Sequence, residues 1–181
     1  MASMIHVGGG ARVYKSDGCG TIIKVDDFGT VNVFTGATDM GQRADTVIAQ
    51  IVAEELGVRM EDVVLTHTDT DVCPWDVGAH ASRTTFVAGN SAKGAAKKVK
   101  DQILEVAAKS MGESPENLDI RDRTIFSRKD PEKKTPLGKI LRAIHYTAGG
   151  TMIMAEHFYD PANENLDKDF KGNLSVTYAY G

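Results

Sequence analysis

Two glycine-bearing polar segments, each followed by a helical pattern, carry the residue types best suited to holding an anionic ligand. The first covers residues 36–42 (GATDMGQ) and the second covers residues 76–85 (DVGAHASRTT). The start of a helix presents N–H groups without helical partners and the positive end of the helix dipole. Two such starts in one small chain predict a ligand with phosphates or many carbonyls. Neither segment has the spacing of a P-loop or of a dinucleotide-binding fingerprint.

Single side chains within these segments have both a functional and a structural interpretation. Gln42 stands at the first turn of the first helical pattern, where its amide can donate to and accept from a heterocycle. Alternatively, Gln42 only begins an amphipathic helix. Ser82 precedes the second helical pattern, a position that favours either capping or anion binding. No nucleophile elbow surrounds Ser82, so we predict no catalytic nucleophile there.

The histidines, cysteines and clustered acids do not form the pattern of a metal site. The five histidines have no helical metal-ligand spacing, and Asp69-Thr70-Asp71 is more typical of a solvated turn than of catalytic carboxylates. Cys19 and Cys73 lie far apart in the sequence without metal-type spacing, which argues against a disulfide framework. We therefore predict no metal ligands and no catalytic residues, and we expect a reducing, cytoplasmic setting.

Length and composition are those of one globular domain, which we expect to cover residues 1–181. The 181 residues carry a net charge of −4, and 41% of them are hydrophobic. This negative balance argues against nucleic-acid binding, and the lysines between 93 and 100 are better interpreted as the solvated face of a helix. No apolar run approaches the roughly 20 residues needed to span a bilayer, so no membrane partner is expected.

Hydrophobic periodicity predicts a series of short strands. Residues 21–25 and 30–34 flank an Asp-Asp-Phe-Gly turn, which is a β-hairpin signal. A second, shorter hairpin is predicted from residues 118–121 and 124–127. Further strands are expected at residues 4–7, 11–14, 63–66, 151–154 and 174–180.

Helices are predicted at residues 42–56, 84–109 and 137–145. Asp39 is a candidate N-cap of the first helix, and Gly57 and Gly112 are expected to end the first two. After each of these glycines comes a one-turn connector that carries Glu, and then a strand, so one local design recurs. The polar segments 68–82 and 160–172 are expected to be loops. Together the predicted helices and strands indicate an α+β fold, with helices packed on a largely antiparallel sheet.

Several short motifs occur in a fixed order along the chain. They are residues 35–42 (TGATDMGQ), 50–58 (QIVAEELGV), 61–63 (EDV), 69–71 (DTD) and 81–85 (ASRTT). This ordered set resembles the molybdenum-binding subunit of the xanthine oxidase family. Residues 76–90 and 172–181 are most similar to the large subunit of 4-hydroxybenzoyl-CoA reductase. The resemblance spans nearly the whole chain and implies part of a molybdopterin-binding domain in an oxidoreductase that acts on an aromatic acyl-CoA.

The resemblance implies a molybdenum pyranopterin cofactor in its cytosine dinucleotide form. The family's glycine–glutamine motif touches the pterin and corresponds here to Gly41 and Gln42. The family's loop before the long helix holds the phosphate and the pterin, and it corresponds to Ala79, Ala81, Ser82, Arg83 and Thr84. Arg43 departs from the glycine that the family usually has. Its side chain would either crowd the cofactor or add a charge beside the phosphate.

The family's catalytic glutamate and its substrate-side loop have no counterpart in this sequence. Residues 112–115 (GESP) resemble the glutamate motif, but they stand between a helix and a strand and are interpreted as structural. Since the family subunit is several times longer, the chain is expected to be a fragment of it, inactive in isolation. Its expected partners are the remainder of the molybdenum subunit and the iron–sulfur and flavin subunits.

Two expectations remain open on the sequence alone. A truncated sheet exposes strand edges, which predicts a homo-oligomer. The alternative to a cofactor-binding segment is a catalytically inert folded fragment, or an assembly module, that does not bind cofactor alone.

Overall fold

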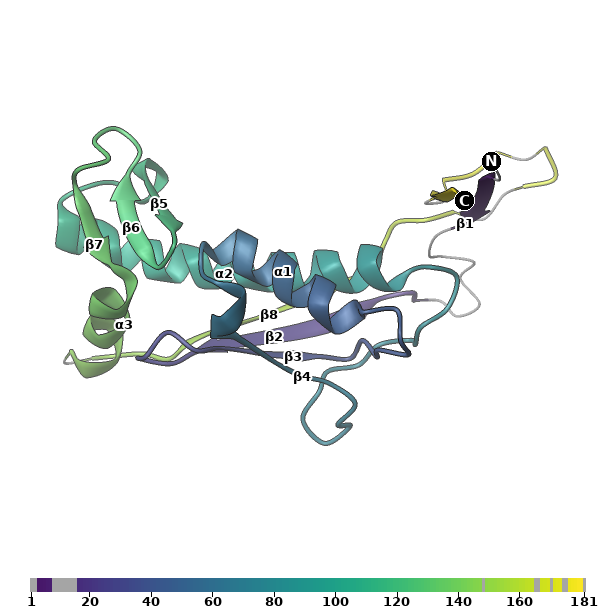
Figure 1. The fold of residues 1–181 in the computed structure, drawn as a ribbon, viewed down its shortest axis with the longest axis horizontal. Coiled ribbons are helices and arrows are strands. Elements are labelled where there is room, and N and C mark those ends of the chain that lie inside the picture. The colour runs from purple at the N-terminus through teal and green to yellow at the C-terminus, as the bar shows by residue number, and fades with distance from the viewer. Residues whose placement is uncertain are drawn as a thin grey trace.

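The computed structural model describes residues 3–7, 16–147, 149–164, 167–169, 171–173 and 176–180. The strand expected at residues 11–14 lies outside these ranges, as does part of the one expected at 174–180. β1 (Ser3–Val7) and β9 (Val176–Tyr180) form an antiparallel pair. This pair lies apart from the remaining elements in Figure 1.

A four-stranded sheet forms the centre of the molecule, and α1 and α2 cover one of its faces (Figure 1). The strands follow the order β4–β3–β2–β8. Their bounds are Cys19–Val25 for β2, Val31–Thr35 for β3, Val63–Thr66 for β4 and Ile153–Tyr159 for β8. β2 pairs antiparallel with β3 and β8, whereas β3 and β4 run parallel. The expected α+β fold with a largely antiparallel sheet is confirmed. The parallel pair follows from the α1 crossover between β3 and β4.

The turn between β2 and β3 confirms the predicted hairpin. The carboxylate of Asp26 accepts hydrogen bonds from the amides of Phe28 at 3.0 Å and Thr30 at 2.8 Å. Gly29 has a φ of 91°, a conformation in which a Cβ would be strained. Beyond the turn, alternate residues of β3 are buried, so the hairpin sets which side chains enter the core.

The α-helices within the described residues are α1 (Ala44–Leu56), α2 (Thr84–Met111) and α3 (Leu137–Tyr146). Gly57 and Gly112 end α1 and α2 with φ values of 70° and 61°, as predicted. α1 begins two residues later than expected because Arg43 has a φ of 60°. Asp39 reaches α1 from upstream, where its Oδ2 accepts from the Asp45 amide at 3.4 Å.

The recurring local design is confirmed. A one-turn 3₁₀ helix follows each of the two glycines: η1 (Met60–Asp62) leads into β4, and η2 (Pro115–Asn117) leads into β5. Within the described ranges, none of the helices is both long enough and apolar enough to cross a membrane.

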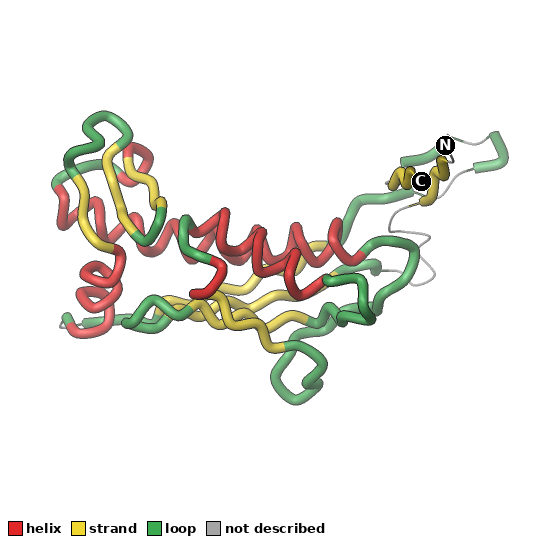
Figure 2. Tube along the Cα trace, in the orientation of Figure 1, coloured by secondary structure: helices red, strands yellow, loops and turns green. Residues whose placement is uncertain are grey.

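A second sheet lies at the C-terminal end of α2, next to α3 (Figures 1 and 2). Its antiparallel strands are β5 (Leu118–Arg121), β6 (Thr124–Ser127) and β7 (Lys134–Pro136). The predicted hairpin is β5–β6. β7 was not predicted because its three residues carry no apolar alternation. β8 begins at Ile153 and extends to Tyr159, beyond the predicted 151–154, because Glu156 and His157 interrupt its apolar pattern.

Small residues on α2 let this helix lie close to its neighbours. A Cβ added at Gly94 would stand 2.1 Å from Cδ2 of His157, and one added at Gly89 would stand 2.9 Å from Ile51. The Ser91 hydroxyl donates to the His157 carbonyl of β8 at 2.8 Å. The same helix buries Ala88, Ala92, Ala95 and Ala96. α2 is therefore fixed against both α1 and β8.

Candidate functional site

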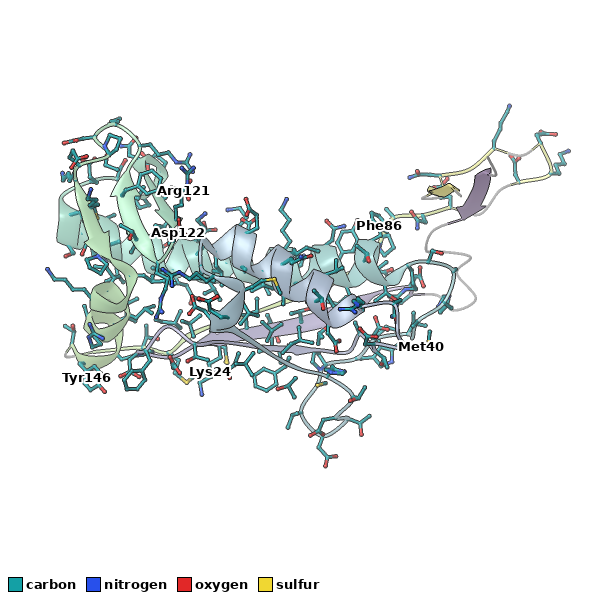
Figure 3. The ribbon with its side chains drawn as sticks, viewed as in Figure 1. Lys24, Met40, Phe86, Arg121, Asp122 and Tyr146 are labelled. Atoms are coloured by element: carbon teal, nitrogen blue, oxygen red, sulfur yellow. The ribbon has the colours of Figure 1, made fainter. Side chains whose placement is uncertain are left out.

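Two loops lead into α1 and α2, and both helices begin at the same end of the molecule (Figure 1). α1 and α2 pack side by side. Met40, in the first loop, and Phe86, in the first turn of α2, are labelled at this end in Figure 3. The fold therefore brings the two sequence-predicted segments to one end, where the positive poles of two helix dipoles also lie.

The first loop, between β3 and α1, is held by hydrogen bonds among its own residues. Oδ1 of Asp39 accepts from the Gly41 amide at 2.6 Å, and this bond lowers the pKa of the exposed Asp39 carboxyl. Oε1 of Gln42 accepts from the Met40 amide at 2.5 Å, and its Nε2 donates to the Thr38 carbonyl at 2.9 Å. Gln42 therefore closes the loop on itself.

Gly41 and Arg43 both adopt left-handed backbone conformations beside Gln42. Gly41 has a φ of 104°, and nothing stands within 4 Å of the position of a Cβ, so its backbone is open to approach. Arg43 has a φ of 60° and an exposed side chain. A φ of this kind favours glycine, which gives a physical reason for the glycine expected at this position.

The second loop, between β4 and α2, places two adjacent non-glycine residues in the left-handed region. Ala81 has a φ of 47° and Ser82 a φ of 53°, whereas Arg83 is right-handed. A change of hand between neighbouring residues turns successive amides toward one side, as in anion-binding nests. Ser82 is exposed, and its hydroxyl makes no hydrogen bond with the described residues. The N-cap position belongs to Arg83, so Ser82 does not cap α2.

Arg83 is buried, with an exposed fraction of 1%. Its Nη1 lies 3.1 and 3.0 Å from the two carboxylate oxygens of Asp76 and 2.8 Å from the Gly78 carbonyl. Its Nη2 donates to the carbonyls of Asp17 at 2.7 Å and Gly18 at 3.0 Å. The guanidinium thus joins the second loop to the start of β2.

A second carboxylate, that of Asp17, completes this buried cluster. Nε of Arg83 stands 3.2 Å from Oδ1 of Asp17, and Nε2 of His80 stands 3.7 Å from the same oxygen. Oδ2 of Asp17 is buried without a hydrogen-bond partner among the described residues. The Asp17 amide donates to Asp160 at 3.1 Å. One guanidinium therefore faces two buried carboxylates where β2 begins and β8 ends.

A cleft of about 520 Å³ opens between the two loops. Gly36 and Thr38 of the first loop line one side, and Cys73, Trp75 and Asp76 of the second loop contribute to the other. The Trp75 ring also contacts Phe158 of β8 at a centroid distance of 6.1 Å. Gly41, Gln42 and residues 79–84 do not line this cleft. The predicted site residues therefore lie at the helix starts, outside the cleft, and all of them except the buried Arg83 are at least partly exposed.

Several supporting residues were missed by sequence reasoning. Nε2 of His67 pairs with Asp45 at 3.0 Å, which ties the end of β4 to the first turn of α1. Asp17 gave no signal, because its partner Arg83 lies far along the chain. Burial raises the pKa of the Cys19 thiol to about 12, and the charge of Asp76 acts in the same direction. A search of the sequence for acidic residues close to Arg83 would have suggested Asp76 but not Asp17.

The arrangement fits an anionic ligand better than a metal ion. The described residues contain no group of three His, Cys, Asp or Glu side chains able to hold a metal. At the start of α2, by contrast, the amides of the strained Ala81–Ser82 pair, the partnerless Ser82 hydroxyl and the first amides of the helix all offer hydrogen-bond donors. This donor set suits phosphate oxygens.

Comparison with protein families identifies the family to which the chain belongs. A family model described as "Molybdopterin cofactor-binding domain" matches residues 1–181. The chain belongs to this family. It is a molybdopterin cofactor-binding domain of the molybdenum hydroxylases, and the resemblance to the xanthine oxidase family is confirmed at that level.

The relatives are subunits of larger enzymes. The xanthine dehydrogenase molybdenum-binding subunit of Escherichia coli O157:H7 is 42% identical over 140 residues, which cover 76% of this chain and 19% of that subunit. Subunit gamma of the 6-hydroxypseudooxynicotine dehydrogenase complex of Paenarthrobacter nicotinovorans is 38% identical over 167 residues, covering 88% of this chain and 19% of that subunit. The chain therefore spans about a fifth of each relative's length.

Solved structures share the fold. CO dehydrogenase from Oligotropha carboxidovorans superposes with a TM-score of 0.80 at 23% identity, over 97% of this chain and 22% of that one. Quinoline 2-oxidoreductase from Pseudomonas putida 86 gives a TM-score of 0.79 at 24% identity, over 97% and 23% of the two chains. The α+β architecture is thus that of a segment within much longer chains.

Proposed function

We propose that this chain supplies the phosphate- and pterin-holding surface of a molybdenum hydroxylase-type oxidoreductase. The observation that carries the proposal is the left-handed pair Ala81–Ser82 at the start of α2. No hydrogen bond among the described residues uses the amide of either residue. Backbone strain that internal bonds do not offset is typical of ligand-binding segments. Membership of the molybdopterin-binding family supplies the ligand class.

In this proposal the second loop holds the phosphates. The amides of Ala81, Ser82 and Thr84 donate to phosphate oxygens, and the dipole of α2 favours the negative charge. The Ser82 hydroxyl adds a further donor. Ala79 and Arg83 complete the predicted contact set, with Arg83 either touching the phosphate or acting through the loop.

The first loop faces the pterin. Gly41 lets the ligand approach the backbone, since no side chain crowds it. Gln42 can bond the pterin only by giving up its bonds to Met40 and Thr38, so binding requires this loop to rearrange. When bound, the cofactor supplies two-electron chemistry at molybdenum. The residues of this chain bind and orient it.

The finer assignments rest on the motif resemblance. We propose the cytosine dinucleotide form of the cofactor and an aromatic acyl-CoA substrate such as 4-hydroxybenzoyl-CoA. Residues 1–181 act as a single-domain fragment of the molybdenum subunit and are inactive alone. The proposed partners are the rest of that subunit, iron–sulfur and flavin subunits, and a second copy of the chain. Two free cysteines support a reducing, cytoplasmic setting.

The second candidate function is an assembly module that binds no cofactor alone. The sheet face opposite α1 and α2 carries Val64, Met154 and Phe158, with exposed fractions of 48%, 44% and 52%. The register places these residues on the face away from buried Ile23 and Val33. An apolar face of this kind favours contact with another protein segment.

Reconstitution with molybdopterin cytosine dinucleotide distinguishes the two functions. We expect the purified chain to retain molybdenum, and acid treatment of the complex to release a cytosine nucleotide. Ser82→Ala should weaken retention by about 10-fold, since a hydrogen bond to a charged group is worth about 1.5–3 kcal/mol. Ser110→Ala, at the exposed end of α2, is the matched control. No retained metal or nucleotide in the wild-type chain would favour the assembly module.

A further inference from the structure

Both terminal nitrogens of the Arg83 guanidinium are already bonded within the protein, and its Nε is buried beside Asp17 without a hydrogen bond. A guanidinium offers five N–H groups in a planar fork. Here Nη1 and Nη2 donate to both oxygens of Asp76 and to three backbone carbonyls. Nε lies 3.2 Å from Oδ1 of Asp17, as an ion pair. With 1% of the residue exposed, a phosphate could reach this group only if the cluster came apart.

The same bonds close the second loop at both of its ends. Nη1 of Arg83 donates to the Gly78 carbonyl at 2.8 Å, so one side chain spans the segment that contains the left-handed pair. The Arg83 amide donates to the His80 carbonyl at 3.1 Å. Asp76 holds the other end, because its Oδ1 accepts from the Gly78 amide at 2.7 Å as well as from Arg83.

Resting on the function proposed above, we propose that Arg83 is a positioning residue for the phosphate loop and makes no direct phosphate contact. Asp76 and Asp17 fix its guanidinium, and the guanidinium fixes residues 78–83 in the strained conformation that directs the Ala81 and Ser82 amides at an anion. The loop is therefore preformed before any ligand arrives, since the bonds that hold it are all internal.

The buried cluster also anchors the loop to the sheet. The carbonyls of Asp17 and Gly18 that accept from Arg83 belong to the residues entering β2, and the Asp17 amide is bonded to Asp160 just after β8. A side chain that served only to stabilise α2 would need none of these contacts. The anchoring to two strands sets the position of the loop relative to the sheet as well as its conformation.

Amide hydrogen exchange of the empty chain, paired with cytidine diphosphate binding by calorimetry, tests this role. Arg83→Lys keeps the charge and loses the fork. We expect exchange of the two hydrogen-bonded loop amides, those of Gly78 and Arg83, to accelerate. Cytidine diphosphate affinity should fall as well, each by about 10-fold, as when a group that orients a ligand-binding residue is replaced. Asp17→Asn is a milder second variant, with the same direction of change. Arg123→Lys, at the opposite end of the fold, is the control.

Each outcome decides the proposal. Accelerated exchange at the Gly78 and Arg83 amides, with the middle of α2 unchanged, supports it. Lost cytidine diphosphate binding with unchanged exchange would mean that Arg83 contacts the phosphate directly and would overturn the positioning role. Unchanged exchange and unchanged binding in both variants would overturn it as well. If the wild-type chain binds no cytidine diphosphate, the function proposed above fails, while the exchange data still decide what holds the loop.

Discussion

In the part of the chain that the structure describes, two pairs of adjacent non-glycine residues adopt left-handed conformations, and their surroundings differ. Asp122 and Arg123 have φ values of 45° and 59°, and Ala81 and Ser82 have values of 47° and 53°. Asp122 is labelled near one end of the body in Figure 3, whereas Phe86, close to the second pair, is labelled near the other. Because the backbone strain is similar, the two pairs differ mainly in the hydrogen bonds that their polar groups make.

In the Asp122–Arg123 pair, Arg123 bonds to several other parts of the protein. Positive φ at both residues is the geometry of a type I′ turn, here joining β5 to β6. The Arg123 amide donates to Gly57 at 3.1 Å, and its carbonyl accepts from Leu137 at 2.8 Å. Its guanidinium donates to the Phe28 carbonyl at 2.7 Å. This strain is offset by internal bonds and ties the small sheet to α1, α3 and the β2–β3 turn.

The Ala81–Ser82 pair has no such bonds of its own. Within the described residues, the neighbours Gly78, His80 and Arg83 carry the contacts that hold it. The difference teaches that left-handed residues alone do not mark a site. A strained segment is a candidate site when two conditions hold. The backbone amides of the strained residues make no hydrogen bond within the protein, and hydrogen bonds of the neighbouring residues hold the segment in place.

The largest expected contrast is in stability. Arg83→Ala leaves the Asp17 and Asp76 carboxylates buried without their cation, which should lower the free energy of unfolding by about 3–5 kcal/mol. Arg123→Ala removes a guanidinium that is 40% exposed, so solvent screening limits its loss to about 1 kcal/mol or less. Urea unfolding of both variants measures the difference. Equal losses would show that the two arginines have equivalent structural roles.

A smaller contrast concerns the backbone conformation itself. Ala81→Val places a β-branched side chain at positive φ and should cost about 1–2 kcal/mol. Asn tolerates this conformation, so Asp122→Asn should change stability by no more than about 0.5 kcal/mol. Ala81→Gly is the control for side-chain loss. Denaturation midpoints compare the three variants, and a neutral Ala81→Val would mean that the loop relaxes freely.

Sequence reasoning found the chain segments but not the contacts that distinguish them. Helix ends at Gly57 and Gly112, the β2–β3 hairpin and the β5–β6 hairpin follow local rules, so their positions were predicted to within a few residues. Local patterns reach only a few residues along the chain.

The Arg83 cluster could not be predicted for that reason. Its partner Asp17 lies 66 residues away in sequence, and no periodicity links the two. α2 begins at Thr84, as predicted, and its N-cap is therefore Arg83. The capping alternative had assigned this role to Ser82, one residue too early. The short strand β7 escaped because polar residues can join a sheet edge without apolar alternation.

The smallest expected effect concerns the ionisation and reactivity of the two thiols, those of Cys19 and Cys73. Burial, and then Asp76, raise the pKa of Cys19 from its ordinary 9.0 to about 12. The unfolded thiol ionises from about pH 9 while the folded one stays neutral, so stability should fall as pH rises above about 9.

At pH 8 a thiol reagent should modify Cys73 and spare Cys19. Arg83→Lys should expose Cys19, and Asp122→Asn should not. Rapid modification of both thiols in the wild-type chain would contradict the packed loop.

The most direct test of the account is a titration of the isotopically labelled chain with cytidine diphosphate, followed by amide NMR. We predict saturable shifts at the amides of Ala81, Ser82 and Thr84, while those of Asp122 and Arg123 stay unchanged. Adenosine alone, which lacks phosphate, is the control and should move none of them. Absence of shifts at the Ala81–Ser82 pair, or equal shifts at both left-handed pairs, would contradict the claim that the start of α2 is a phosphate site.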